Sequence, residues 1–355
     1  MKAAIKTLCI TVVLFLSFMM VNSAWAADKP VKLRYASFFP ENQLMSEIQK
    51  IWQQEVTKRT KGLITFESYW GASMGAPMAH LELIKKGTAQ VGCMHEWYTP
   101  SRFIFGNFEY VFPFGPTDYE IVAKANRKIR AEFPQFAQDA KKENIIMLMD
   151  APGGEYAFMS TKPLKSIADF KGEKVTLVGR YFGRWMPPGA TAVVRPVAER
   201  YDLLRTGVVN VDLLPFEHFD AFKIYEVAKY FIKARLTTAL YGPIYMNLDT
   251  FNSFSPEIQK ILLDTGRDVE MMAAKEIIPN KYKALMKVYK DKGVTFIDFP
   301  ESEIKKWAEM LPDIPAEFAA ECEAKGYPGN KLVQRWQEIT EEMGYKWPRK
   351  WGVKK

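Results

Sequence analysis

The sequence predicts an α/β fold made of two lobes, and three observations support this prediction. Short segments with the two-residue alternation of a strand are followed by segments with helical periodicity, and this order recurs along the chain. Such alternation is typical of βαβ units that build a mostly parallel sheet. The pattern restarts after Ala151, as a second unit would. The 355 residues also exceed what one small hydrophobic core needs, which favours two lobes.

In the first half of the chain, three expected strands alternate with two expected helices. The first helix ends at Gly62, because glycine readily takes the left-handed conformation that closes a helix. The second helix begins at Pro77, which suits a first helical turn, and Gly87 ends it after Lys85 and Lys86. The expected strands are residues 31–37, 64–67 and 91–94. The apolar face of the first helix consists of Leu44, Ile48, Ile51, Trp52 and Val56.

After Ala151 the same alternation begins again. Ser166 and Asp169 have the spacing of a capping box, ahead of an expected strand at residues 174–178. Gly207 is expected to end a short helix, and a buried strand should run from there over residues 208–215.

A long helix is expected to begin at the Ser-Pro pair at residues 255–256. Pro279 should kink or end it, because proline lacks the amide proton and clashes with the preceding turn. A strand at 294–299 and a helix from Ser302 follow, and the aromatic, basic tail at 347–351 should be a packed loop. The residues of the long helix that should face inward are Ile258, Ile261, Leu262, Val269 and Met272.

Residues 1–26 have the pattern of a secretory signal peptide. Lys2 and Lys6 supply positive charge, an apolar run follows from residue 8 to residue 21, and residues 24–26 fit the small-residue cleavage rule. The apolar run is short for a membrane span, and no other apolar stretch in the sequence is long enough. We therefore expect an exported, soluble mature chain.

The composition excludes a disordered chain and gives little support to a nucleic-acid role. Hydrophobic residues make up 48% and aromatic residues 14% of the sequence. The net charge of +8 falls by two, to +6, when Lys2 and Lys6 are removed, and the remaining basic residues are dispersed without a nucleic-acid-binding motif. Only Cys93 and Cys322 survive processing, which is too few for a disulfide framework.

The stretch from Gly189 to Tyr230 is the most informative part of the chain. It reads GATAVVRPVAERYDLLRTGVVNVDLLPFEHFDAFKIYEVAKY, and it places Glu199 and Tyr201 on a short helical pattern. It closely resembles the solute-receptor subunits of TRAP transporters (tripartite ATP-independent periplasmic transporters). Their signature combines a Gly-Ala turn, an E-x-Y helix, a G-V-V-D-G strand start and a Y-E-V-x-K-Y segment. Weaker likenesses extend in the same order over nearly all of the mature chain, at residues 33–36, 57–62, 112–114, 162–163 and 169–172.

The resemblance implies a periplasmic binding protein-like fold of the TRAP receptor type, with a long lobe-spanning helix and a solute held between the lobes. It implies a non-catalytic periplasmic receptor, without a cofactor, that passes a small organic solute, expected to be a carboxylate or sulfonate, to TRAP membrane permease subunits. A monomer is expected, with a dimer as the alternative. Lobe I would comprise residues 27–150 and 236–278, and lobe II residues 151–235 and 279–355.

The polar residues that TRAP receptors use to hold a carboxylate are replaced in this chain. The positions that match the family's two arginines and its asparagine are Glu155, Thr176 and Leu214. A carboxylate that is enclosed in a cleft is strongly destabilised unless it is paired and hydrogen-bonded. The identity of the solute therefore cannot be transferred from dicarboxylate or sialic acid receptors.

Arg180 is the candidate to replace the lost arginines. It follows the strand that contains Thr176, Gly179 and Gly183 lie near it, and a guanidinium can meet two carboxylate oxygens at once. Glu155, next to Tyr156, would orient Arg180 through an ion pair or meet an amino group of a zwitterionic or cationic solute. The alternative is that Arg180 and Arg184 face water or pair with acidic side chains.

Further candidates lie at the ends of expected strands. His95 and Glu96 end the third strand, where open α/β sheets place ligand contacts, although lone polar residues are more often surface groups. Core packing is the ordinary role of an aromatic residue. Several of them in one cleft would instead favour an aromatic or amphipathic solute, or capture of an ammonium group. The aromatic candidates are Phe38, Trp70, Phe216, Trp97 and Trp185.

Three other functions have less support. Ser73 lies in a G-x-S-x-G segment, and Asp212 and His218 follow in the order of a serine hydrolase, but these two are six residues apart and no oxyanion segment precedes the serine. A secreted serine hydrolase is thus a remote alternative. The three histidines of the chain fit no metal motif. A receptor that serves a sensor protein instead of a permease is the remaining alternative.

Overall fold

The computed structural model describes residues 29–177 and 181–352. Within them, ten strands form one sheet, which is parallel at both ends and antiparallel in the centre, around β4 and β9. A mostly parallel sheet was expected, and the centre differs because β4 and β9 run against their neighbours. The order is β2 (Ile64–Tyr69), β1 (Val31–Ala36), β3 (Val91–Cys93), β9 (Thr238–Asn247), β4 (Ile145–Ser160), β7 (Val211–Pro215), β5 (Lys174–Leu177) and β6 (Thr191–Val194); β8 (Tyr230–Lys233) also pairs with β4, and β10 (Thr295–Asp298) pairs with β8.

Strand β4 joins the two ends of the sheet. Its first part, up to Glu155, pairs with β9, whereas residues 156–160 pair with β7 and residues 158–160 also pair with β8. The pairing with β9 is irregular around Pro152, which has no amide proton to donate to the ladder and is followed by two glycines. One connection between the two halves of the molecule is therefore a strand with an irregular centre.

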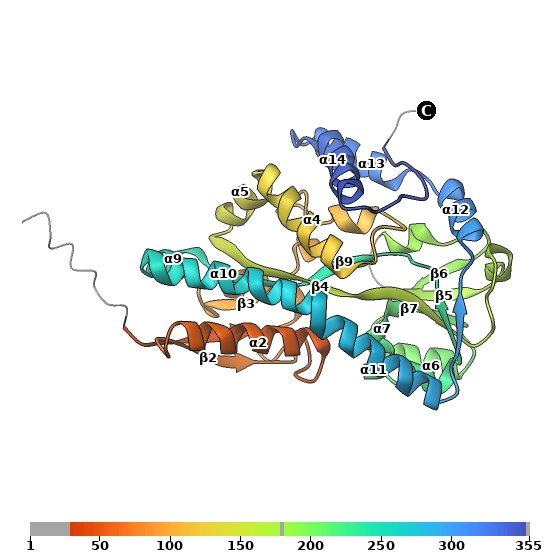
Figure 1. The fold of residues 1–355 in the computed structure, drawn as a ribbon, viewed down its shortest axis with the longest axis horizontal. Coiled ribbons are helices and arrows are strands. Elements are labelled where there is room, and N and C mark those ends of the chain that lie inside the picture. The colour runs from red at the N-terminus through yellow and green to blue at the C-terminus, as the bar shows by residue number, and fades with distance from the viewer. Residues whose placement is uncertain (1–28, 178–180, 353–355) are drawn as a thin grey trace, which may run out of the picture.

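Helices cover this sheet along its length (Figure 1). In the β1–β3 half they are α2 (Leu44–Arg59), α3 (His80–Lys85), α4 (Tyr119–Glu132), α5 (Gln135–Lys142) and α9 (Leu248–Asn252). In the β5–β7 half they are α6 (Arg200–Arg205), α7 (Phe216–Ala221) and α8 (Ile224–Val227). Single 3₁₀ turns lie at η1 (Pro77–Ala79), η2 (Glu96–Tyr98), η3 (Phe108–Val111), η4 (Ile167–Phe170), η5 (Phe182–Trp185) and η6 (Val197–Glu199).

One long helical segment runs beside β4 from one half to the other (Figure 1). It consists of α10 (Pro256–Met272), a π-helical turn (Ala273–Ile277) and α11 (Ile278–Asp291), and the Ser255 hydroxyl caps its first turn as expected. Pro279 does not end the helix. The π-helical turn precedes it and Pro279 lies in the first turn of α11, where a missing amide proton is tolerated.

Most of the expected boundaries are confirmed by the backbone. Gly62, Gly87 and Gly207 have positive φ angles at the ends of their helices. Ser166 and Asp169 form a capping box, on a 3₁₀ turn instead of an α-helix. The strand expected from residue 208 begins only at Val211, and Val208 is 50% exposed, because residues 207–209 still belong to the turn that closes α6.

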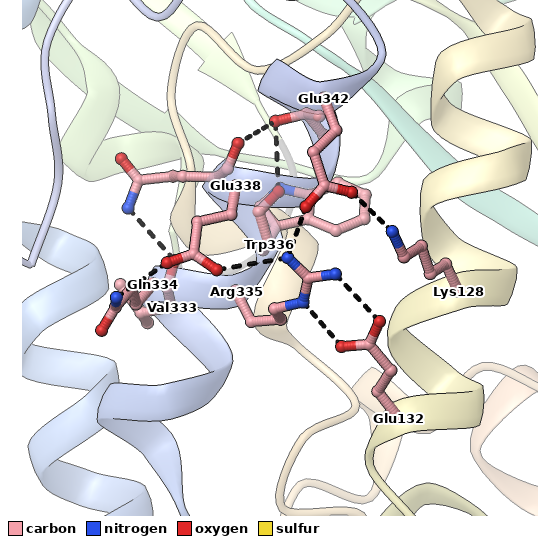
Figure 2. Close-up of polar contacts among 10 residues, drawn as sticks. Lys128, Glu132, Val333, Gln334, Arg335, Trp336, Glu338 and Glu342 are labelled. Atoms are coloured by element: carbon pink, nitrogen blue, oxygen red, sulfur yellow. Dashed lines mark hydrogen bonds and ion pairs between the residues drawn. The ribbon is translucent and has the colours of Figure 1, made fainter.

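The C-terminal part of the chain packs against both halves of the molecule. It contains α12 (Glu301–Met310), α13 (Ile314–Glu323) and α14 (Gly329–Glu342), and Trp351 of the tail is buried against α14 as a packed loop. Figure 2 shows how α14 is fixed to α4: the Arg335 guanidinium donates to both oxygens of Glu132 at 2.7 and 3.0 Å. Lys128 donates to Glu342 at 2.5 Å beside this pair.

Two further expectations concern the signal peptide and membrane-spanning segments. The expected signal peptide, residues 1–26, lies outside the described residues. Among residues 29–177 and 181–352, no helix combines the length and the hydrophobicity that a membrane crossing requires.

Candidate functional site

The carboxyl ends of β1 and β3 meet in a cluster of aromatic rings. These strands are neighbours in the parallel part of the sheet, so the residues that follow them lie at one edge. Phe38 follows β1, and its ring centroid lies 5.3 Å from that of His95 and 6.0 Å from that of Tyr98, which both follow β3. The ring of His95 lies 4.9 Å from that of Trp97. Phe38 and His95, which were each expected at the end of a strand, are thus brought together.

The aromatic contacts continue from this edge into the second half of the molecule. Trp97 stacks on Tyr110 with 4.7 Å between ring centroids, and Tyr110 lies 5.9 Å from Phe182 of η5. The Phe182 ring is then 4.5 Å from Tyr156 of β4 and 4.5 Å from Trp185. Residues from distant parts of the sequence therefore form one aromatic wall.

A pocket of about 520 Å³ opens against this wall. A volume of this size suits a small organic molecule. Most of its lining is apolar, and it comes from the turn after β3, from the start of η5 and from α13. The lining residues are Trp97, Tyr98, Pro100, Ser101, Ile104, Asn107, Tyr110, Tyr181, Phe182, Phe318, Glu321, Cys322 and Lys325.

Glu96 lies behind this wall and is held by other protein groups. Its carboxylate accepts hydrogen bonds from the Arg130 guanidinium at 3.2 and 3.3 Å and from the Tyr245 hydroxyl at 2.5 Å. Arg130 also lies 3.3 Å from Asp150. Glu96 is not among the residues that line the 520 Å³ pocket. Arg130 escaped the sequence analysis because an arginine on an amphipathic helix has the pattern of a solvent-exposed residue.

The two histidines next to Phe38 are buried. Burial, with a smaller effect of His80, lowers the pKa of His95 to about 3, so its imidazole is neutral at physiological pH. The two ring nitrogens of His80 lie 2.8 Å from the Cys93 carbonyl oxygen and 3.2 Å from that of Gly75. His95 therefore carries no positive charge at physiological pH.

Glu155 and Tyr156 are consecutive residues of β4, so their side chains project to opposite faces of the strand. Tyr156 faces the aromatic wall through Phe182. Glu155 is buried on the other side, with the Lys233 ammonium 4.0 Å away. Burial raises the pKa of Glu155 to about 7, although Lys233 and Arg235 oppose this effect.

Replacing Glu155 with glutamine should make the protein less sensitive to pH. The pKa of Glu155 is raised in the folded state. Its contribution to stability is therefore fully present below pH 4.5, the ordinary pKa of the group, and it is lost as the pH rises through about 7. Between pH 4.5 and pH 8 the free energy of unfolding of Glu155→Gln should therefore rise by up to about 3 kcal/mol relative to that of the native protein. A difference of one pKa unit corresponds to about 1.4 kcal/mol. Urea unfolding at both pH values measures the difference. Glu276→Gln, at an exposed site, is the control, and parallel pH profiles for the native protein and Glu155→Gln would contradict the prediction.

Thr176 and Leu214, which the resemblance matched to ligand residues of the family, are internal. The Thr176 hydroxyl donates to Asp212 at 2.8 Å, and the Arg200 guanidinium donates to the same oxygen at 2.6 Å. Arg200 and Asp212 are both fully buried, and Leu214 is buried in a hydrophobic cluster. The buried arginine of this region therefore binds a protein carboxylate. The sequence analysis did not select Arg200, because the sequence does not indicate that it is buried.

The remaining candidates contact other parts of the protein. Trp70 packs on Tyr35, at 5.5 Å between ring centroids, and Phe216 is fully buried against Tyr282 at 5.0 Å. Arg184 pairs with Glu317 of α13 at 2.7 Å. Arg180 lies outside the described residues.

The structure separates the residues of the hydrolase alternative. Asp212 is engaged by Arg200 and Thr176, as described above, and no contact joins Ser73 to Asp212 or His218 in the described part of the chain. Among the described residues, no group of three potential metal ligands is positioned to hold a metal ion.

Comparisons with known proteins agree with this architecture. Residues 35–321 match the family described as bacterial extracellular solute-binding protein, family 7. A solute-binding protein of Albidiferax ferrireducens is 23% identical over 303 residues, which cover 83% of this chain and 88% of that protein. A TRAP periplasmic solute-binding protein from Desulfovibrio salexigens has a TM-score of 0.80 at 22% identity, and the match covers 90% of this chain and 98% of that one.

A second solved structure, a TRAP solute-binding protein from Rhodoferax ferrireducens in complex with copurified benzoate, has a TM-score of 0.75 at 21% identity. That match covers 88% of this chain and 98% of the other. At such identities the structural likeness establishes the two-lobe fold, and the family match identifies the protein as a solute-binding receptor and not an enzyme. This chain belongs to the bacterial extracellular solute-binding proteins of family 7.

Proposed function

We propose that this chain is a periplasmic receptor that captures a small organic acid and delivers it to a TRAP-type membrane permease. The observation that supports this most directly is the aromatic pocket of about 520 Å³ beside the residues that follow β3, in a chain of a solute-binding family. This is the edge at which open α/β sheets bind ligands.

The lining of the pocket favours an aromatic carboxylate among the organic acids. Tyr110 and Phe182 are among the aromatic residues that line the pocket, and a buried aromatic contact with a solute would add about 1 kcal/mol beyond its area. The structural relative from Rhodoferax ferrireducens was solved with benzoate, which has this chemistry. The sequence left open a receptor for an aromatic or a zwitterionic solute as the alternative. We favour the aromatic solute.

Arg180 is our proposal for the residue that captures the anion. In the sequence it directly precedes Tyr181 and Phe182, which line the pocket. Arg184, the other candidate, pairs with Glu317, and releasing it would break that ion pair. Thr176 and Leu214 are enclosed by other residues, so we assign the solute contact to Arg180 instead of to them.

Binding would proceed by closure of the two lobes around the solute. β4 and the long helix α10–α11 connect the two halves, and the irregular pairing around Pro152 is the natural place for a hinge. Closure removes water from the pocket and strengthens the charged contacts, so the solute shifts the population towards the closed form. The lobe boundaries that we propose are those expected from the sequence.

The proposed function is tested first by a ligand screen. Purified protein is heated in the presence of benzoate, 3-hydroxybenzoate, galacturonate, pyroglutamate, a sulfonate and benzylamine. At a concentration of 100 times Kd, a ligand adds about 2.7 kcal/mol to the stability of the folded state, so the unfolding temperature should rise clearly with at least one acid. If no acid raises it, or if benzylamine alone does, the organic-acid function is wrong.

Replacing Arg180 with alanine should then remove tight binding of the best acid and leave the fold intact. A buried charge that loses its partner costs about 3–5 kcal/mol, so affinity should fall by at least a hundredfold. Isothermal titration calorimetry measures the affinity, and circular dichroism checks the fold. Arg205→Ala is the matched control and should change affinity far less, because Arg205 is exposed, pairs with Asp202 and does not line the pocket. Equal affinities of native protein and Arg180→Ala would remove Arg180 from the site.

A further inference from the structure

We propose that helix α13 is a wall of the solute pocket and that Lys325, just beyond its end, adds a second cationic contact to the carboxylate of an aromatic acid whose ring lies against Phe318. This inference rests on the proposed function and deepens it, because it assigns a binding residue and a ligand class to a segment at the C-terminal end of the chain.

The geometry of the pocket places α13 directly on it. Four of the residues that line the pocket come from α13 and the turn that follows it: Phe318, Glu321, Cys322 and Lys325. Phe318 is buried and belongs to the same hydrophobic cluster as Tyr110 and Phe182. An aromatic ring that enters the pocket therefore meets rings from three separate segments of the chain.

The wall is fixed on both sides of the pocket. On the η5 side, the Arg184 guanidinium meets both carboxylate oxygens of Glu317, each at 2.7 Å. On the α4 side, α13 packs against α14, and Arg335 of α14 holds Glu132 of α4 (Figure 2). A bidentate arginine–carboxylate pair has a restricted geometry, so these pairs give α13 a defined position.

Lys325 is a positively charged residue at the edge of this wall, and it lines the pocket. It is exposed, and within the described part of the chain it forms no ion pair. Its position is set by the turn that ends α13, in which the Lys325 amide donates to the Cys322 carbonyl oxygen at 2.9 Å. Glu321 also lines the pocket, but it already takes part in another interaction. An unpaired ammonium beside apolar rings complements an aromatic carboxylate.

Lys325 lies beyond the part of the chain that matches the family. The match ends at residue 321, inside α13, and the turn that carries Lys325 follows it. The recognition that we propose would select the solute of this chain among the many acids that a common fold can accept.

The test compares variants of Lys325 by isothermal titration calorimetry with benzoate as the probe, and with benzamide as its uncharged analogue. Lys325→Met should weaken benzoate binding about three- to tenfold, as expected for a partly exposed charged hydrogen bond, and leave benzamide binding unchanged. Lys325→Glu should weaken benzoate binding further, and high salt should reduce both effects. Phe318→Ala should weaken both probes about equally, by roughly tenfold.

Lys305→Met is the matched control, because Lys305 is an exposed lysine on the neighbouring helix α12 and does not line the pocket. It should bind benzoate as the native protein does. Lys325 is exposed, so its variants should fold normally, and circular dichroism verifies this. Equal benzoate affinities of native protein and Lys325→Met overturn the role of Lys325. If benzoate does not bind but galacturonate or pyroglutamate does, the aromatic class is wrong while the receptor function stands.

Discussion

Replacing Arg200 with methionine should lower the free energy of unfolding by about 4 kcal/mol, because removal of one partner of a buried ion pair leaves an uncompensated charge. Arg200 and Asp212 are both fully buried and 2.6 Å apart. In the variant, the hydroxyl of Thr176 is the one side-chain hydrogen bond that the Asp212 carboxylate keeps among the described residues. The effect is measured by urea unfolding of the purified protein at pH 7.

A second variant separates the loss of the pair from the loss of the guanidinium's volume. Burial already raises the pKa of Asp212, and removal of Arg200 should raise it further. The Arg200→Met variant should therefore be less destabilised at pH 5 than at pH 8, where the unpaired carboxylate must stay charged. The double variant Arg200→Met/Asp212→Leu should recover most of the loss, because an apolar pair needs no compensation. If the free energy of unfolding of Arg200→Met falls by less than about 1 kcal/mol, water reaches this pair.

Replacing Gly266 with alanine should lower the free energy of unfolding by at least about 3 kcal/mol or prevent folding. Gly266 lies in the middle of α10, where alanine is otherwise the better helix former by about 1 kcal/mol. A β-carbon at this position would lie 1.8 Å from the backbone carbonyl oxygen of Leu148 in β4. A backbone atom cannot turn away, so α10 would have to move off the sheet.

Arg267→Ala is the control for this variant, because it introduces the same residue one position further along and its side chain is exposed. It should change stability by no more than about 0.5 kcal/mol. Thermal unfolding followed by circular dichroism, together with the soluble yield, compares the two variants. A Gly266→Ala protein with the unfolding temperature of the native protein would show that α10 does not need its close approach to β4.

The order of the elements could be predicted because it is set by short-range chemistry. Gly62, Gly87 and Gly207 end their helices in the left-handed conformation that only glycine adopts at little cost, and Ser255 begins the long helix through its hydroxyl group. Pro279 shows the limit of such rules. It was expected to kink or end the helix, but the π-helical turn before it accommodates it and packing against α7 and β4 holds α11 in place.

The candidate site was predicted in part. Phe38 and His95 were each expected at the end of a strand, and the structure brings their rings together because the ends of neighbouring parallel strands meet. The partners of Glu96 could not be found in the same way, since Arg130 and Tyr245 come from elements 34 and 149 residues further along the chain. The role of α13 in the pocket depends on equally distant contacts.

The sequence by itself therefore determined the family and the alternation of strands and helices. These follow from periodicity, from turn residues and from the order of motifs, which are all local. Only the tertiary structure decided that Glu96 and Arg200 are held inside the protein and that Lys325 faces the pocket. The physical reason is that a charged side chain acts through the partners around it, and those partners are brought together by folding.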